Sequence, residues 1–275
     1  MHPPSGVIAF LTDFGYRDPY VAAMKGVALS INPSAKLVDV THEVPSFDVD
    51  TGAFTLLASY RYFPPGTVFV VVVDPSVGSA RRAIAIATRR YYFVGPDNGV
   101  LIPAAEEDGI ELAVELSNPE YWRHPVSASF HGRDIFTPAG AWISRGVPLR
   151  CLGRVVDVST LARPRVGMWM ELSGSCAKLR VIHIDKFGNV VLSQRFEELA
   201  KALALSIGSV VEVRTQSSRA LARVARVFSE VGKGELVLYR DSFDLAELAI
   251  NLGSARDALG VDRGCVVEVC RVEGS

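Results

Sequence analysis

The sequence lacks long hydrophobic runs and any large excess of charge of one sign. No apolar stretch approaches the roughly 20 residues that span a bilayer. The amino-terminal MHPPSGVIAF has no basic region followed by a long apolar segment, as a signal peptide would. The formal net charge of -1 provides no basic surface for nucleic acid and no polybasic patch for a membrane. We therefore expect no nucleic-acid partner and no membrane partner.

Cysteine is scarce as well, with four residues in a chain of 275: Cys151, Cys176, Cys265 and Cys270. Cys265 and Cys270 differ in parity along one predicted strand, so their side chains would point to opposite faces. The sequence thus predicts neither a disulfide framework nor a CxxC metal site. A reduced, cytoplasmic protein is the expectation.

Motifs of several enzyme classes are missing too. No GxGxxG follows the first predicted strand and no GxxxxGK[ST] occurs, so neither a conventional dinucleotide site nor a P-loop is predicted. No GxSxG elbow is present, and the five histidines show no HExxH or similar metal-binding spacing. We therefore predict that the protein has no metal site.

The amino-terminal half has the pattern of a doubly wound α/β fold. Apolar runs predict strands, and between them a helix begins near Asp18 and ends at Asn32, and a second covers Thr51–Tyr60. This βαβαβ order is typical of a parallel sheet covered by helices. A hairpin and a further strand and helix follow. The predicted strands of this half are Val7–Leu11, Lys36–Val40, Val68–Val73, Ala83–Ala87, Tyr91–Val94 and Ile110–Leu116.

The composition changes beyond the connection Leu161–Gly167, LARPRVG, where we place a domain boundary. We therefore divide the chain into residues 1–165 and 166–275. Short strands separated by glycines in the second part predict a small β-barrel or β-sandwich. Those strands are Ala177–Ile184, Asn189–Leu192, Ser209–Val213, Ala222–Phe228, Glu235–Tyr239, Leu245–Asn251 and Cys265–Val272.

A candidate site follows the central strand. The run Val68–Val73 does not alternate, as expected for a strand covered on both faces, and it ends at Asp74. Arg81 follows one short turn later. Because ligands of open α/β sheets bind outside the carboxyl ends of the strands, this acid and this guanidinium are candidate site residues. The alternative is that Asp74 caps a turn and Arg81 is a solvated charge.

Four stretches together carry a family resemblance. They are LTDFGYRDPYVAAMKG (Leu11–Gly26), VVDPSVGSARR (Val72–Arg82), FHGRDIFTPAGA (Phe130–Ala141) and IDKFGNVVLS (Ile184–Ser193). In order and spacing they resemble the S-adenosyl-L-methionine (SAM) hydroxide adenosyltransferases, or SAM hydrolases, which are relatives of the SAM-dependent fluorinase and chlorinase.

The resemblance implies a mainly parallel α/β sandwich domain followed by a small carboxyl-terminal β-barrel. It also implies a homotrimer, in which the barrel of a neighbouring subunit completes each nucleoside site. The implied reaction is attack of water or hydroxide on C5′ of SAM, which yields adenosine and L-methionine. SAM is then the substrate and no cofactor is expected. The residues that match the catalytic set of the hydrolases are Asp74, Arg81 and His131.

Further positions match substrate-binding residues of the family. Asp13 is expected to bind the ribose hydroxyls, although it could simply cap a turn. Asn189 resembles the adenine-reading residue, or it is a turn residue in the left-handed conformation. Phe47 and Phe228 would stack on adenine or ribose, unless they are ordinary core residues. Positions near the nucleoside or methionine end are Asp185, Ser242 and Glu247.

Two other functions are weighed against hydrolysis. The halogenases have an aromatic residue at the position of Asp74, a serine at that of Gly132, and an insertion before the PDNG-like turn that is lacking here. These differences disfavour a 5′-halogenase. A SAM or adenosine sensor without turnover is disfavoured because it would not need the Asp74, Arg81 and His131 set to orient water.

Overall fold

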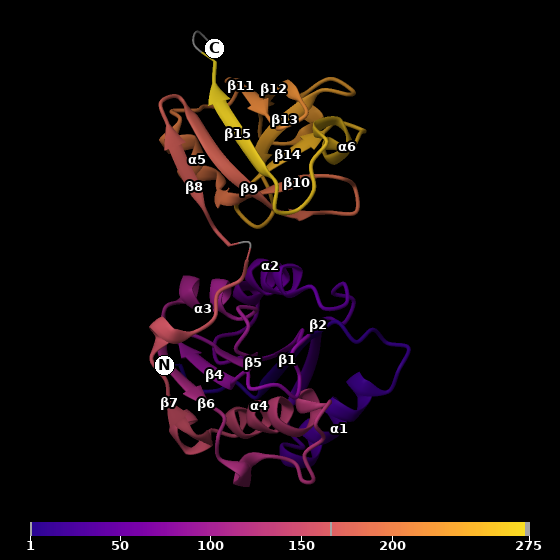
Figure 1. Cartoon of the computed structure of the whole chain (residues 1–275), viewed down its shortest axis with the longest axis vertical. Coiled ribbons are helices and arrows are strands. Elements are labelled where there is room, and N and C mark those ends of the chain that lie inside the picture. The colour runs from indigo at the N-terminus through magenta and orange to yellow at the C-terminus, as the bar shows by residue number, and fades with distance from the viewer. Residues whose placement is uncertain (1, 166, 273–275) are drawn as a thin grey trace. The chain divides into compact units, whose positions relative to one another are not determined.

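The computed structural model describes residues 2–165 and 167–272, and the chain forms two compact units, residues 1–165 and 166–275 (Figure 1). An α/β unit comes first and a β-barrel unit second, so the predicted fold class is confirmed.

The α/β unit is built on a seven-stranded sheet with the order β2-β1-β3-β5-β4-β6-β7. The neighbouring strands from β2 to β5 are parallel, whereas β4, β6 and β7 pair antiparallel. The predicted hairpin corresponds to β4 and β5. The strands are β1 (Val7–Thr12), β2 (Lys36–Thr41), β3 (Val68–Val72), β4 (Ala83–Thr88), β5 (Tyr92–Pro96), β6 (Ile110–Glu115) and β7 (Arg154–Val155), and the helices are α1 (Tyr20–Ile31), α2 (Val49–Ser59), α3 (Ile102–Asp108) and α4 (Thr137–Ser144).

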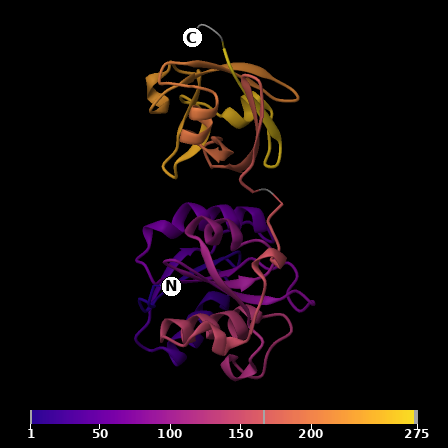
Figure 2. The same cartoon turned by 90° about the vertical axis from the view of Figure 1, so that its left-hand side faces the viewer.

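Helices cover both faces of this sheet. α1 and α4 lie on one side, and α2 and α3 lie on the other (Figure 1, Figure 2). Alternate residues of β3 therefore enter two different cores: Val70 packs with Met24 of α1, and Phe69 packs with Leu56 of α2. Every residue of β3 is buried, which explains why its sequence is apolar without alternation.

The parallel pairing brings two loops to one edge of the sheet. In the register of β1 and β3, Thr12 lies opposite Val72. Asp13 and Asp74 follow these two strands closely, so both carboxylates lie at the carboxyl edge. A π-helical turn, η3 (Gly132–Phe136), leads directly into α4 near the same edge and contacts β3 and β5. This edge is where the predicted site residues of the unit gather.

The second unit is a closed barrel of seven strands, in the order β10-β14-β13-β12-β11-β15-β9 and back to β10. β8 pairs with the outside edge of β9, and all the pairings are antiparallel except that of β12 with β13. The strands are β8 (Met170–Ser173), β9 (Cys176–Ile184), β10 (Val190–Arg195), β11 (Val210–Arg214), β12 (Arg219–Val224), β13 (Leu236–Arg240), β14 (Leu245–Ile250) and β15 (Val266–Arg271), and the helices are α5 (Phe196–Ala202) and α6 (Ala255–Leu259).

One predicted strand is too long. The strand expected over Ala222–Phe228 ends at Val224, and Phe228 begins a 3-10 turn, η6 (Phe228–Glu230). Ala225 donates its backbone amide to Leu238 outside the ladder, and Phe228 is about half exposed. The segment thus passes from the barrel wall into a loop, and an aromatic side chain there is left on the surface.

The expectation that the chain has no disulfide is wrong. Cys176 of β9 and Cys270 of β15 are bonded, whereas Cys151 and Cys265 are exposed free thiols. Cys265 and Cys270, which differ in parity along one chain segment, are not bonded to each other. The antiparallel register of β9 and β15 instead places Cys176 directly opposite a residue 94 positions away.

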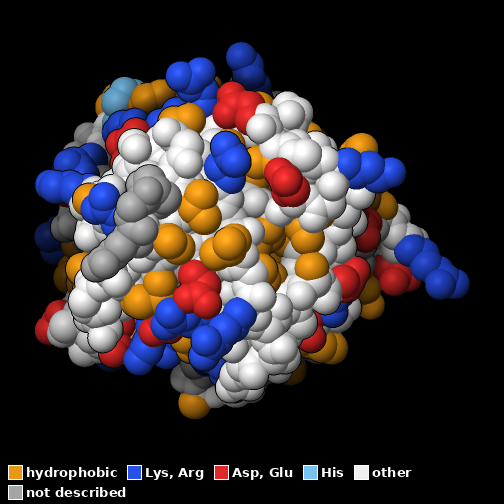
Figure 3. All heavy atoms as spheres, turned by 90° about the horizontal axis from the view of Figure 1, so that it is seen from above, with side chains coloured by type: hydrophobic (Ala, Val, Ile, Leu, Met, Phe, Trp, Pro, Cys, Tyr) orange, Lys and Arg blue, Asp and Glu red, His pale blue; other side chains and the backbone are white. Residues whose placement is uncertain are grey.

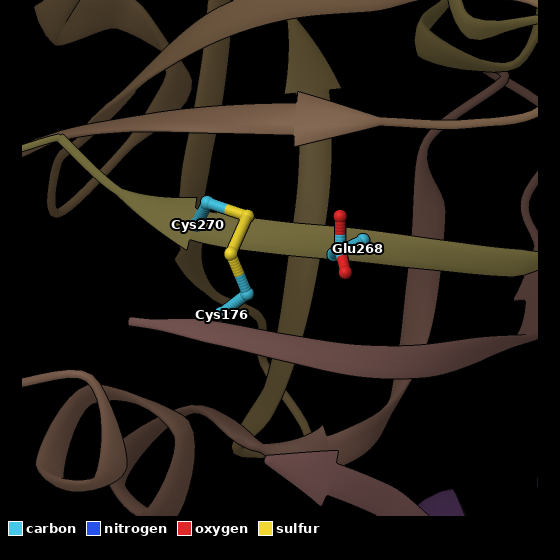
Figure 4. Close-up of side chains that lie close together, drawn as sticks. All are labelled: Cys176, Glu268 and Cys270. Atoms are coloured by element: carbon cyan, nitrogen blue, oxygen red, sulfur yellow. A yellow bond between two sulfur atoms is a disulfide. The ribbon is translucent and has the colours of Figure 1, made fainter. Parts of the chain in front are cut away.

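The disulfide also accounts for a cluster of metal-ligand atoms. The two sulfurs and the Glu268 carboxylate lie within 4.8 Å of one another, and Figure 4 shows the bond bridging the two strands. Because the sulfurs are bonded to each other, they offer no thiolate to a metal.

The surface charges agree with the net charge of -1, and the helix lengths agree with the lack of long apolar runs in the sequence. On the face shown in Figure 3, acidic and basic side chains are interspersed around a group of hydrophobic ones. Among the described residues, no helix is both long enough and apolar enough to cross a membrane.

Loss of the disulfide should destabilise the protein. The bond closes a loop of 94 residues, for which restriction of the unfolded chain gives at most about 4.7 kcal/mol, and disulfides typically contribute about 2–4 kcal/mol. We expect Cys176→Ser/Cys270→Ser to lower the free energy of unfolding by that amount in calorimetry. The control Cys151→Ser/Cys265→Ser, which alters only exposed free thiols, should change it by no more than about 0.5 kcal/mol. Equal stability of the two double variants would contradict the assignment.

Candidate active site

Asp74, Arg81 and His131 meet at the carboxyl edge of the α/β sheet. Arg81 Nε lies 3.1 Å from each carboxylate oxygen of Asp74, and its Nη2 donates to Oδ2 as well. The same Nη2 lies 2.9 Å from Nδ1 of His131. The side chains of Arg81 and Asp74 are only 8% and 4% exposed. The alternative of a solvated arginine is therefore excluded by the structure.

The guanidinium fixes the tautomer of the histidine. Arginine has donors only, so Nδ1 of His131 must accept and the ring proton of the neutral imidazole lies on Nε2. Burial lowers the pKa of His131 below its ordinary 6.5, and the charge of Arg81 lowers it further. The imidazole is thus neutral at neutral pH, with Nε2–H as its free donor.

The Arg81 guanidinium also packs against the ring of Phe136. Its Cζ lies 5.0 Å from the centre of that ring, within cation–π distance. Phe136 belongs to the same η3 turn as Asp134, which is completely buried and accepts from Arg133 Nε at 2.7 Å and from the Ser127 amide at 2.9 Å. Burial opposes ionisation of Asp134, but the hydrogen bonds outweigh it and lower its pKa. The hydrogen bonds and ion pair of Asp134 therefore stabilise the segment that bears His131.

Asp13 is the second carboxylate at this edge. Its Oδ2 accepts the Phe47 amide at 2.8 Å. Burial raises the pKa of Asp13 above its ordinary 3.8, and the nearby charge of Asp74 contributes in the same direction. Phe47 has a left-handed φ of 68° and is 69% exposed, so it is not a core residue. A strained backbone that leaves an aromatic ring in solvent beside a carboxylate is typical of a ligand site.

The other five predicted substrate-binding residues line one cavity of the barrel unit. Its volume is about 560 Å³, which suits a small-molecule ligand. Sequence reasoning missed Tyr239 and Asp241, because a β-strand tyrosine and a turn aspartate carry no signal by themselves. Predicted residues that line it are Asp185, Asn189, Phe228, Ser242 and Glu247, and further lining residues include Phe187, Tyr239, Asp241, Phe243 and Leu252.

Asp185 organises the turn that carries Asn189. Its Oδ1 accepts the amides of Phe187 and Asn189 at 2.8 and 2.9 Å, and its Oδ2 accepts the Asn189 side-chain amide at 3.0 Å. The left-handed position of the turn is taken by Gly188, with φ 83°, and not by Asn189. With its NH₂ group bound to Asp185, Asn189 presents its side-chain oxygen as an acceptor for an amino group.

Glu247 is an acid of the cavity with a strongly raised pKa. It is 6% exposed, accepts a hydrogen bond from the Tyr239 hydroxyl, and has Asp241 and Asp185 nearby. Burial is the main cause that raises its pKa to about 7, and the two neighbouring charges add to it. Phe228 packs edge-on against Tyr239 at 6.3 Å while about half exposed, so it too lies outside the core.

The fold and these residues define an α/β protein with a buried acid–guanidinium–imidazole cluster, joined to a barrel with an acidic, aromatic cavity. Family models of the SAM hydroxide adenosyltransferase N-terminal and C-terminal domains match residues 8–153 and 179–268. The chain belongs to the SAM hydroxide adenosyltransferase family.

Named relatives agree with this assignment. A (R)-S-adenosyl-L-methionine hydrolase of Salinispora tropica is 41% identical, over 95% of this chain and 96% of the relative, and one of Thermus thermophilus is 38% identical, over 95% and 98%. A fluorinase of Actinoplanes sp. is 28% identical over 96% and 97%. A crystal structure of an uncharacterized conserved protein from Thermotoga maritima superposes with a TM-score of 0.89 at 39% identity, covering 96% of this chain and all of that one.

Protonation of Glu247 should stabilise the fold. A carboxyl whose pKa rises on folding, here from 4.5 to about 7, holds its proton more tightly in the folded state. The free energy of unfolding should therefore fall as pH rises from about 4.5 to about 7, by up to about 3 kcal/mol for this group. Urea unfolding of wild type and Glu247→Gln at pH 5 and pH 8 tests this. The loss between the two pH values should be smaller in Glu247→Gln, and equal losses would show that Glu247 ionises normally.

Proposed function

We propose that this protein hydrolyses SAM to adenosine and L-methionine. The observation that carries the proposal is the convergence of Asp74, Arg81 and His131 at the carboxyl edge of the sheet. Support also comes from the relatives named as SAM hydrolases, which are more similar to this chain than the fluorinases are.

The chemistry needs an activated nucleophile and little else. The sulfonium of SAM is already a good leaving group, because it departs as a neutral thioether. Water is the difficulty, since its pKa in bulk is about 15.7. A site that holds one water in line with the C5′–S bond and accepts its proton as the new C–O bond forms lowers that barrier. We propose that neither a metal nor a cofactor takes part.

We assign the proton to Asp74. The only lone pair of neutral His131 is engaged by Arg81, so the imidazole can donate from Nε2 but has no free acceptor. The water oxygen attacks C5′, the electron pair of the C5′–S bond leaves with sulfur, and the water proton passes to the Asp74 carboxylate. Arg81 holds the Asp74 carboxylate in position before the reaction and stabilises the hydroxide-like oxygen during it. Asp74 then releases the proton to solvent.

The barrel cavity suits the substrate by charge and by shape. Asp185, Asp241 and Glu247 provide negative charge for a ligand that bears a sulfonium and an ammonium group. Aromatic rings such as Phe228 provide a surface on which adenine can stack. The Asn189 oxygen is suited to the adenine amino group, and we propose that Asp13 binds the two ribose hydroxyls and Phe47 packs against the nucleoside. We place Ser242 at the methionine end.

We further propose that the protein is a cytoplasmic homotrimer, in which the barrel of a neighbouring subunit completes each nucleoside site. Each unit exposes large apolar side chains close to its candidate site residues. Phe47 is 69% exposed in the α/β unit, and Phe187 and Leu252 are 66% and 79% exposed at the barrel cavity. Exposed apolar residues gathered at a site indicate an interaction surface.

Purified protein incubated with SAM should release free adenosine, measured by chromatography. In the presence of chloride or fluoride no 5′-halo nucleoside should form. Asp74→Ala should lower turnover by at least about 100-fold, because the water loses its acceptor, while the affinity for adenosine changes little.

A second acid–arginine pair supplies the control for Asp74→Ala. Arg82 donates to Asp97 at 2.7 Å, but neither residue contacts the cluster in any described bond. Asp97→Ala should lower stability and keep turnover within about threefold of wild type. A 5′-halo nucleoside, unchanged SAM, or full turnover by Asp74→Ala would each overturn the proposal.

Turnover should also decline in acid. Protonation of His131 removes the acceptor for Arg81 and places a second cation beside it. Because the pKa of His131 is lowered, kcat should be constant at neutral pH and fall as pH drops through a value below 6.5. Measurement of kcat from pH 4.5 to 8.5 tests this, and the inflection should be lost in His131→Asn. An inflection above 6.5 that depends on His131 would contradict the lowered pKa of this imidazole.

A further inference from the structure

A relay of two buried side chains and one half-buried carboxylate lies directly beside Asp13, and the reaction described above does not use it. Thr12 is the last residue of β1 and is completely buried, and its Oγ1 lies 2.8 Å from Nδ1 of His42. Nε2 of His42 lies 3.0 Å from Oδ1 of Asp39, a residue of β2. The relay Thr12–His42–Asp39 therefore joins the carboxyl ends of two adjacent parallel strands.

Asp39 is held in its ionised form. Its Oδ2 accepts from Lys25 Nζ at 2.7 Å and from the Tyr16 hydroxyl at 3.0 Å. Burial by itself would raise the pKa of Asp39, but the hydrogen bonds from Lys25, His42 and Tyr16 outweigh burial and lower it. An ionised carboxylate can only accept, so His42 donates to it from Nε2.

The direction of the remaining bonds follows. In neutral His42, with its proton on Nε2, Nδ1 is an acceptor, so the Thr12 hydroxyl donates to it. The same hydroxyl oxygen accepts the amide of Phe14 at 3.2 Å. The His42 carbonyl accepts the amide of Gly15 at 2.7 Å. One hydroxyl thus fixes the backbone on both sides of Asp13, since it belongs to residue 12 and binds residue 14.

We propose that Thr12, held by His42 and Asp39, is a positioning residue for the Asp13 carboxylate and thereby sets the affinity for the ribose of the substrate. The inference rests on the proposed function. The hydrogen bonds that the ribose hydroxyls donate to Asp13 are expected in the bound substrate and in the transition state alike. A displaced Asp13 therefore weakens both states equally, which raises KM and leaves kcat unchanged.

Thr12→Val tests the relay because valine keeps the branched shape and removes the hydroxyl. The loss leaves Nδ1 of His42 and the Phe14 amide without this partner, and we expect KM for SAM to rise by about five- to tenfold with kcat unchanged. Thr12→Ser restores the hydroxyl and should return KM to within about twofold of wild type. A tenfold fall in kcat would place Thr12 with the Asp74 cluster and overturn the proposal.

The matched control is Thr88, the last residue of β4, which is equally buried. Its Oγ1 lies 2.6 Å from the Asp108 carboxylate and accepts the Tyr91 amide at 3.1 Å, so the chemistry resembles that of Thr12. β4 runs antiparallel to β5, which places Thr88 at the opposite edge of the sheet. Thr88→Val should lower thermal stability but keep KM. If both valine variants change stability alone, the role of Thr12 is structural and the proposal fails.

Coupling to Asp13 gives a second test. In the Asp13→Ala background the ribose acceptor is already lost, so Thr12→Val should raise KM by less than about twofold. A full five- to tenfold rise in that background would show that Thr12 does not act through Asp13.

Amide exchange separates this inference from failure of the proposed function. The Phe47 amide is bonded to the Asp13 carboxylate, so displacement of Asp13 should speed its hydrogen exchange in Thr12→Val and not in Thr88→Val or Thr12→Ser. This measurement needs no substrate. If wild type forms no adenosine but the exchange result holds, the proposed function fails and the positioning of Asp13 stands. Unchanged exchange at Phe47 in Thr12→Val overturns the positioning role.

Discussion

The site depends on one buried ion pair, that of Asp74 with Arg81. Two charges that are almost completely removed from solvent are stable only when each satisfies the other. The neighbouring segments support this pair. β3 ends just before Asp74, the following turn brings Arg81 back to it, and the ring of Phe136 packs against the guanidinium. The Nη2 group of Arg81, which also donates to Asp74, donates to Nδ1 of His131 and fixes that neutral ring as a donor at Nε2.

Burial shifts three groups of the candidate site toward their neutral forms. It lowers the pKa of His131 and raises those of Asp13 and Glu247, to about 7 in the last case. A ligand that brings positive charge into such surroundings favours ionisation of both acids. The shifts therefore fit a cationic substrate such as SAM. Binding of such a ligand would depend on the ionisation of these two acids.

Backbone conformation also shapes the two loops that carry the candidate binding residues Phe47 and Asn189. Gly188 takes the left-handed position of the Asp185–Asn189 turn, which leaves Asn189 free to present its side chain, whereas Phe47 takes a left-handed conformation itself and holds its ring in solvent. In both loops a half-buried carboxylate accepts backbone amides of the loop. The carboxylates of Asp13 and Asp185 thus shape the loops as well as facing the proposed ligand.

The sequence by itself determined the class of each unit, because strand and helix periods depend on local burial, and the apolar run Val68–Val73 followed by Asp74 identified the central strand and its edge. Motif order also determined the family. Tertiary structure alone decided what depends on pairing between distant segments. The register of β9 and β15 joined Cys176 to Cys270, and the pairing of β10 with β14 brought the Asp185–Asn189 turn close to Glu247. The contact with Arg81 likewise determines the tautomer of His131. No local sequence pattern predicts this contact, because the two residues are brought together only by the fold.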